Sequence, residues 1–388
     1  MTVDAELVER VRSRLVRSGE PPTAARVAAA LRSEGAVVGD RMLLDVVGAV
    51  RAELAGAGPL EPLLADPEVT DVLVNGPSEV WVDRGSGLER SPVAFSDAAS
   101  VARLAQRLAA AAGRRLDAAQ PTVDARLPNG VRLHAVLPPI SPVGPLISLR
   151  IARSRAFTLD ELQDRATVTA EMALLLRDMV QKRITFLVTG GTGSGKTTLL
   201  SSLLSEVAPE ERIVLVEDSG ELRPTHPHVV RLEARHANVE GTGQVDLREL
   251  VRQALRMRPD RLVVGEVRGG EVVDLLAALN TGHDGGCGTV HANSPEALPA
   301  RLEALALAAG LGRAALHSQL VAAVQLVVHV VRGRDGSRRV AALSVLERSV
   351  HGLAEVVPAL VMNEDRRLHE GRGAARLSAL LTSPDRSA

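Results

Sequence analysis

A glycine-rich segment at residues 190–197 constrains the fold of this chain more than any other stretch. It matches the pattern G-x-x-x-x-G-K-[ST], follows a short apolar run at residues 184–188 and leads into an apolar, helix-like run at residues 198–204. A strand before the loop and a helix after it form the context that a phosphate-binding loop requires. The sequence therefore predicts a phosphate loop between a buried strand and a helix, and a chance match is the weaker alternative.

The residue types of this loop suit a nucleoside triphosphate bound with Mg²⁺. Glycine tolerates positive φ and lets the backbone approach phosphate closely, and the amides of the loop and of the helix N-terminus favour an anion. Lys196 would place its charge on the β- and γ-phosphates, and the Thr197 hydroxyl would ligate Mg²⁺. The residues expected to contact the nucleotide here are Gly190, Gly191, Thr192, Gly193, Ser194, Gly195, Lys196, Thr197 and Thr198.

Lysine is rare in this chain, which gives the motif lysine additional weight. Of the 46 basic residues only Lys182 and Lys196 are lysines, and arginine is used everywhere else. A lysine at the one position where the motif requires it is therefore a further reason to assign Lys196 to phosphate binding.

The composition excludes several classes of protein. The chain has 388 residues, a formal net charge of −1, one cysteine and 1% aromatic residues. It has no global positive field to attract nucleic acid, few side chains that could stack on bases, and no possible internal disulfide. No apolar run reaches the roughly 18 residues of a membrane-spanning helix, and the acidic N-terminus is unlike a signal peptide. The sequence predicts a cytoplasmic protein that binds no nucleic acid directly and associates with a membrane peripherally, through partners.

The order of predicted elements divides the chain into five segments. Residues 1–55 are expected to be helical, and residues 56–151 combine strands, tight turns and one helix, as in a small α+β domain. Residues 152–168 are expected to be a linker. Residues 169–350 alternate strands and helices, which predicts a mostly parallel sheet covered on both faces. Residues 351–388 are expected to be a C-terminal extension with a disordered end.

Two glutamates follow predicted strands of the parallel sheet. Glu217 comes directly after residues 212–216, and Glu266 follows residues 261–264. Ligands bind at the carboxyl edge of such a sheet. Glu217 would orient and deprotonate a water that attacks the γ-phosphate, and Glu266 would hold Mg²⁺ through a water. A turn that caps the next helix is the alternative for Glu217, and a general-base role is the alternative for Glu266.

His291 is a third candidate at this edge. It follows a predicted strand at residues 287–290, where an imidazole can hydrogen-bond the γ-phosphate and report its presence. His283 lies in the glycine-rich turn before that strand. Zinc binding is the weaker interpretation, because these two histidines and Cys287 lack a known ligand spacing.

Four arginines stand out in or directly after predicted strands. Arg126, Arg132 and Arg150 lie in or beside predicted strands of the α+β domain, where a solvated strand face explains each of them equally well. Arg268 follows the third strand of the parallel sheet and could contact phosphate or bridge to a nearby glutamate. The sequence does not choose between these roles.

Further motifs lie on both sides of the phosphate loop, at residues 58–64, 72–76, 124–132, 217–221, 255–261, 265–269, 280–285 and 289–293. Together they resemble the type II/type IV secretion and pilus-assembly traffic ATPases, and most closely the CpaF/TadA group of tight-adherence (Flp) pilus systems. The resemblance covers residues 56–350. It does not extend to the short helical N-terminus or to the C-terminal segment, so the mode of partner docking is not implied.

The resemblance implies an α/β fold in which a RecA-like phosphate-loop ATPase domain with a mostly parallel sheet follows a smaller α+β domain and a short helical segment. It implies a homohexamer that hydrolyses ATP with Mg²⁺ and powers pilus assembly or secretion with an inner-membrane platform protein. Arginines of the N-terminal domain reach the phosphates in such ATPases. The matching positions in this sequence are Arg126, Arg132 and Arg150.

Two other functions are compatible with the same nucleotide site. One is a nucleic-acid-translocating or conjugation-type ATPase, although near-neutral charge and scarce aromatic residues weigh against it. The other is a scaffold that binds ATP and scarcely hydrolyses it, against which the two glutamates argue.

Overall fold

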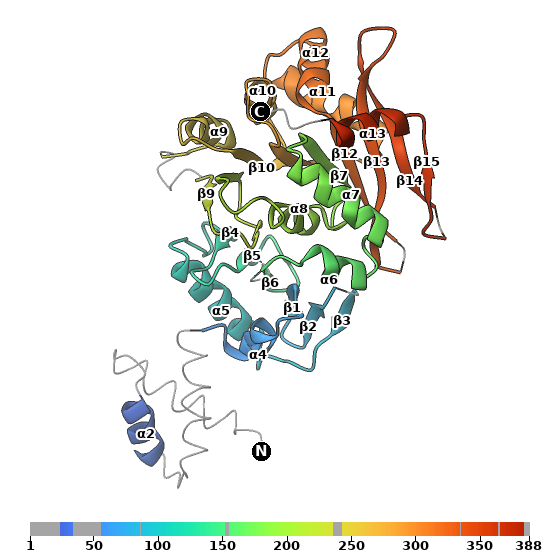
Figure 1. Ribbon diagram of the computed structural model, residues 1–388. Helices are drawn as coiled ribbons and strands as arrows, with labels where there is room; N and C mark the ends of the chain where they lie inside the picture. Colours follow the sequence, from blue (N-terminus) through green and yellow to red (C-terminus); the bar gives the residue numbers. More distant parts are fainter. Residues whose placement is uncertain are drawn as a thin grey trace. The chain divides into compact units, whose positions relative to one another are not determined.

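The chain forms two compact units, residues 1–153 and 154–388 (Figure 1). One helix expected in the N-terminal segment is present as α2, Ala24–Ser33, and the others expected there lie outside the described residues. No helix in the described part of the chain is long and apolar enough to cross a membrane. The computed structural model describes residues 24–33, 56–85, 87–151, 155–235, 243–333, 335–363 and 365–383.

The first unit is built on a six-stranded antiparallel sheet with the order β3-β2-β1-β6-β5-β4. The two hairpins that the turn residues predict are present, as β1–β2 and β4–β5. The apolar face of α5 packs on this sheet, and the Asp97 side chain caps the helix by accepting a hydrogen bond from the Ser100 amide. The elements are η1 (Gly58–Leu60), α4 (Glu61–Ala65), β1 (Asp71–Gly76), β2 (Glu79–Asp83), β3 (Leu88–Arg90), α5 (Ala98–Ala111), β4 (Thr122–Arg126), β5 (Arg132–Val136) and β6 (Leu146–Arg150).

The second unit is built on a nine-stranded sheet with the order β15-β14-β13-β12-β7-β11-β10-β8-β9. The strands from β12 to β9 run parallel, and β13, β14 and β15 continue the sheet in antiparallel fashion. The prediction of a mostly parallel α/β sheet is confirmed. The strands are β7 (Phe186–Gly190), β8 (Ile213–Glu217), β9 (Val229–Glu233), β10 (Arg261–Val267), β11 (Cys287–His291), β12 (Leu326–Arg332), β13 (Arg338–Arg348), β14 (Ala354–Met362) and β15 (Leu368–Glu370).

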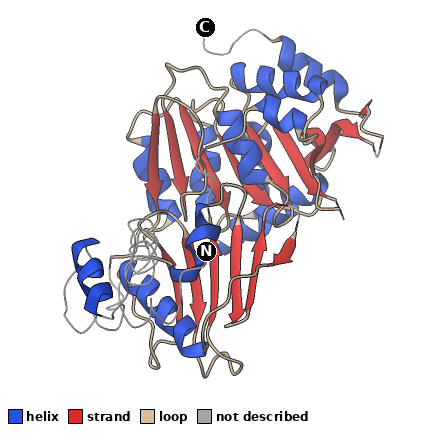
Figure 2. Ribbon diagram, turned by 90° about the horizontal axis from the view of Figure 1, so that it is seen from below, coloured by secondary structure: helices blue, strands red, loops and turns tan. Residues whose placement is uncertain are grey.

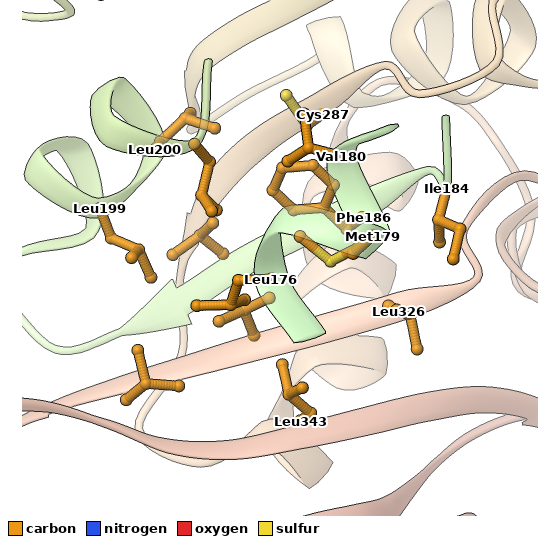
Figure 3. Packing of buried hydrophobic residues seen from close by; sticks show 14 of the residues in the cluster. Leu176, Met179, Val180, Ile184, Phe186, Leu199, Leu200, Cys287, Leu326 and Leu343 are labelled. Atoms are coloured by element: carbon orange, nitrogen blue, oxygen red, sulfur yellow. The ribbon is translucent and has the colours of Figure 1, made fainter. Parts of the chain in front are cut away.

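Helices cover both faces of this sheet (Figure 2). Neighbouring residues of β7 point into opposite cores, Val188 into one and Leu187 into the other. In the first core, Leu176 and Met179 lie close to Phe186 (Figure 3). Burial of each such side chain contributes about 1.5–3 kcal/mol, so the end of β7 is firmly positioned. One face carries α6 (Leu159–Asp164), α7 (Ala170–Gln181), α8 (Lys196–Leu204) and α13 (Ala374–Thr382), and the other carries α9 (Leu247–Leu255), α10 (Glu271–Leu279), α11 (Leu298–Ala308) with η2 (Pro295–Ala297), and α12 (Arg313–Ala323).

The C-terminal segment belongs to this second unit. A separate extension is expected from residue 351, whereas β14 pairs with β13 along most of its length and Leu377 of α13 is buried in the first core. The alternating apolar side chains of β14 need a covered face, and the sheet supplies it.

Candidate active site

The phosphate loop lies between β7 and α8, as the sequence predicts. Gly190, Gly193 and Gly195 have φ of 154°, 70° and 98°, in the region that favours glycine. A Cβ on Gly190 would lie 2.3 Å from the carbonyl oxygen of Val330 in β12, so a larger residue would displace the loop. The loop is therefore seated directly on the neighbouring strand and leads into the N-terminus of α8, where an anion is favoured.

The Lys196 side chain lies along the inside of the loop. Its Nζ donates hydrogen bonds to the carbonyl oxygens of Gly190 at 3.1 Å and Gly191 at 2.9 Å. The residue is 6% exposed, and burial lowers the pKa of its ammonium group. A buried ammonium is stabilised by nearby acceptors and anions. The loop thus holds one concentrated positive charge at the position where phosphate charge would be bound.

His291 links this lysine to a carboxylate. Its Nδ1 lies 3.4 Å from Nζ of Lys196, and its Nε2 lies 2.7 Å from Oε1 of Glu266. Strand pairing creates the contact, because His291 at the end of β11 is directly opposite Gly190 at the end of β7. Burial, followed by the charge of Lys196, lowers the pKa of His291. A neutral ring can accept a hydrogen bond from Lys196 and donate one to Glu266.

Arg268 joins the cluster from the end of β10. Its guanidinium donates to Oε2 of Glu266 and lies 3.8 Å from a carboxylate oxygen of Asp218. Burial disfavours the ionised form of Glu266, but the hydrogen bond and charge of Arg268 outweigh it and lower the pKa of Glu266. The structure therefore brings four predicted residues into one network, Lys196, His291, Glu266 and Arg268, in which Glu266 is ionised.

Glu217 makes its hydrogen bonds elsewhere. It is 3% exposed, and its Oε1 accepts hydrogen bonds from the backbone amides of Glu221 and Leu222, both at 2.8 Å. Its Oε2 has no hydrogen-bond partner within the described part of the chain. The absence of a side chain at Gly265 makes room for it, since a Cβ there would lie 2.7 Å from Glu217 Cγ. Burial raises the pKa of Glu217 to about 7. Glu217 thus holds the loop that follows β8, and the next element in the chain is the strand β9 rather than the helix that the capping alternative requires.

Glu217→Gln is expected to change how stability depends on pH. The folded-state pKa of about 7 lies above the usual 4.5, so the carboxyl stabilises the fold fully below pH 4.5 and loses this contribution as pH rises through about 7. The full difference corresponds to about 3 kcal/mol. Glutamine keeps the acceptor for the two amides and does not ionise. We expect denaturant titrations to show a variant more stable than wild type near pH 8 and similar near pH 5. The same stability difference at both pH values would contradict this account.

Strand register in the first unit aligns the three predicted arginines. Arg126 is directly opposite Arg132, and Arg132 is directly opposite Arg150. Opposed residues share a face, so the three form a row across β4, β5 and β6, which we call the arginine row. Arg132 donates to both carboxylate oxygens of Asp124, at 3.2 and 2.8 Å, and Arg150 lies 3.9 Å from Asp71. The carboxylates of Asp124 and Asp71 offset part of this adjacent positive charge, and a bound anion could offset it in the same way.

His283 and Cys287, the other two residues of the zinc interpretation, contact groups outside the network around Lys196. His283 Nδ1 lies 3.1 Å from the carbonyl oxygen of Ala278 in α10. Cys287 is buried, and burial raises the pKa of its thiol to about 12. In the described ranges, no group of three or more His, Cys, Asp or Glu side chains is arranged to hold a metal ion.

Two contacts to the phosphate loop have no signal in the sequence. His329 of β12 is 5% exposed and lies 2.9 Å from the Thr189 hydroxyl, directly before the loop. Nε of Arg338 donates to the carbonyl oxygen of Gly193 at 3.1 Å, from 145 residues further along the chain. Both contacts depend on the pairing of β12 with β7, which no local motif encodes.

Comparison with known proteins agrees with this architecture. The chain matches the family model described as type II/IV secretion system protein over residues 53–375. It is 56% identical over 353 residues to a putative conjugal transfer protein of Mycobacterium tuberculosis, a match that covers 89% of this chain and 99% of that protein. It is 34% identical over 313 residues to the type IV secretion system protein VirB11 of Brucella suis, covering 72% of this chain and 86% of that protein.

Solved structures share the fold. The X-ray structure of the ATPase DotB of Legionella pneumophila has a TM-score of 0.53 and 18% sequence identity, and the match covers 79% of this chain and 80% of that one. The fold is thus an N-terminal α+β domain followed by a RecA-like ATPase domain. Since the family model spans the arginine row, the phosphate loop and the C-terminal strands, the chain belongs to the type II/IV secretion system protein family and is an ATP-hydrolysing enzyme.

Proposed function

We propose that this enzyme is a motor that hydrolyses ATP to power a type IV-like secretion, conjugal transfer or pilus-assembly system. The network of Lys196, His291 and Glu266 at the phosphate loop carries the proposal. It brings the ammonium of Lys196, the neutral imidazole of His291 and the ionised carboxylate of Glu266 into contact beside the loop. The relatives named as conjugal transfer and type IV secretion proteins support the secretion branch. The CpaF/TadA tight-adherence pilus system is the narrower form of the proposal, and it depends on the motifs alone.

Hydrolysis in this site would proceed by in-line attack of water on the γ-phosphate. Lys196 and the loop amides would hold the phosphates and balance the charge that develops on them. Glu266 would orient the water or accept its proton, and Glu217 is the other candidate for that role. The His291 ring bridges Lys196 and Glu266. A γ-phosphate that draws Lys196 toward itself would therefore break the contact between Lys196 and His291. The position of His291 would then report whether the γ-phosphate is present.

Mg²⁺ fits the residues beside the loop. Thr197 offers a hydroxyl in the first turn of α8, and Glu266 offers a carboxylate, which are the oxygen ligands that Mg²⁺ prefers. Both oxygens of Glu266 are engaged, one by His291 and one by Arg268, which favours a contact through water. When bound, Mg²⁺ would neutralise charge on the β- and γ-phosphates.

We also propose that the arginine row of the first unit contacts the nucleotide phosphates. The alignment of three guanidinium groups on one face supports this role. The chain would act as a homohexamer at the cytoplasmic face of the membrane, with an inner-membrane platform protein as its partner. The mass of the protein in solution with and without ATP tests the assembly, and a monomer under both conditions would contradict it.

DNA is expected to leave the rate of ATP hydrolysis nearly unchanged. The net charge of −1 and the 1% of aromatic residues provide neither a positive field nor stacking platforms. The assay measures phosphate release at low salt with single-stranded and with double-stranded DNA, and we expect a change below about twofold. A several-fold stimulation that disappears at higher salt would favour the alternative, a nucleic-acid-translocating ATPase.

A further inference from the structure

The turn that joins β12 to β13 brings two arginines to the phosphate loop. Arg332 ends β12 and Arg338 begins β13, and the two are directly opposite in the ladder, so their side chains share a face. Nε of Arg338 donates to the Gly193 carbonyl oxygen at 3.1 Å. A Cβ on Gly195 would lie 3.2 Å from Arg338 Cδ, and a Cβ on Gly193 would lie 3.5 Å from Arg332 Nη1. Both side chains therefore lie against the second half of the loop.

The two sides of β7 differ in chemistry. On the β11 side lie His291 and Glu266, which the proposed function places beside the γ-phosphate. On the opposite side, β7 pairs with β12, and the two arginines lie there. The loop amides hold the middle of a triphosphate, with its γ end beside Lys196. The nucleoside end of the same molecule is then directed away from Glu266, toward the arginines.

A purine base can stack on a planar side chain, and the second unit has few Phe, Tyr or Trp residues that could provide one. Its aromatic residues are Phe157 and Phe186. Phe186 is 2% exposed in the core, and the Arg165 guanidinium lies over the Phe157 ring at 4.5 Å from its centre. Phe186 is therefore buried in the core, and one face of the Phe157 ring is covered by Arg165. A guanidinium is planar and stacks on π systems, so arginine is the side chain that can replace an aromatic ring here.

We propose that Arg338 is a nucleotide-binding residue that contacts the base and ribose of ATP, with Arg332 beside it. The Gly193 carbonyl fixes the guanidinium by accepting its Nε hydrogen bond, which ties the nucleoside contact to the loop that binds the phosphates. The proposal rests on the proposed function, because it takes the phosphate loop as the ATP site.

The test compares the binding of ATP, ADP and inorganic tripolyphosphate to the full chain by titration calorimetry. Arg338→Lys keeps the positive charge and loses the planar guanidinium. We expect its Kd for ATP and for ADP to rise about fivefold to tenfold. Tripolyphosphate has no nucleoside, so its Kd should change by less than about twofold, which also shows that the variant is folded.

The control variant is Arg348→Ala, at the far end of β13, where the arginine contacts Gly352 and Ser318. It should change none of the three affinities. A parallel loss for all three ligands in Arg338→Lys would mean that Arg338 only shapes the loop, and no loss for any ligand would mean that it makes no contact. Either result overturns the proposal.

Lys196→Ala separates this proposal from the proposed function. If Lys196→Ala binds ATP as tightly as wild type, the phosphate loop is not the ATP site and both proposals fail. If Lys196→Ala loses ATP binding while Arg338→Lys binds ATP and ADP normally, only the inference about Arg338 fails.

Discussion

Replacing Lys196 by alanine is expected to lower ATP turnover at least about 100-fold. The Nζ of Lys196 is buried inside the loop and lies beside His291, so no other side chain of the loop can supply its charge. The loss removes a group that stabilises the phosphates more strongly as negative charge develops in the transition state. Steady-state phosphate release measures the effect.

Lys182→Ala is the matched control for this variant. Lys182 is the other lysine of the chain, and its Nζ donates to the carbonyl oxygen of Ser383 at an exposed position. Its removal should leave turnover unchanged. Thermal unfolding of both variants is needed, because Lys196→Ala leaves the carbonyl oxygens of Gly190 and Gly191 without their donor, at a cost of about 1–3 kcal/mol. Turnover at the wild-type rate in Lys196→Ala would remove the ATPase assignment from this loop.

Glu266→Gln is expected to lower turnover about 100- to 1,000-fold while ATP still binds. Glutamine keeps the shape and can still accept a hydrogen bond from His291, but it neither takes a proton nor carries charge. Glu266 would contact Mg²⁺ only through a water, and glutamine keeps an oxygen for that water, so the affinity for ATP should change little. The loss should therefore appear in kcat rather than in the affinity for ATP, as single-turnover and binding measurements can show.

Glu355→Gln is the control for Glu266, because Glu355 is paired with Arg372 at the surface of β14. It should hydrolyse ATP at the wild-type rate. If Glu217→Gln loses turnover and Glu266→Gln keeps it, the roles of the two glutamates are exchanged.

Much of the fold follows from short-range patterns. Thr158 and Glu161, three residues apart, form a capping box at the start of α6, and the tight turns expected in residues 56–151 join β1 to β2 and β4 to β5. By contrast, β9 is not expected from the sequence. It is an edge strand with only partly buried residues, so it lacks the apolar run that marks β8 and β10.

The candidate site also has one part that the sequence could predict and one part that it could not. Lys196, Glu266 and His291 could each be proposed because each directly follows a strand or a loop with a local signature. Their contact could not be proposed, since it depends on β11 lying between β7 and β10. The burial of Glu217 is likewise a product of packing, because Gly265 from the neighbouring strand provides the space.

By itself, the sequence determined that a strand, a phosphate loop and a helix follow one another around Lys196, because φ preferences, apolar runs and helix propensity act over a few residues. It also determined which polar residues stand at strand ends. Only the tertiary structure decided which of them meet. Sheet order placed β11 with His291 on one side of the loop and β12 with His329 on the other. The C-terminal hairpin carries no motif, yet its Arg338 donates a hydrogen bond to the carbonyl oxygen of Gly193. This contact depends on nonlocal strand pairing, which is selected by the packing of the whole core rather than by any one segment.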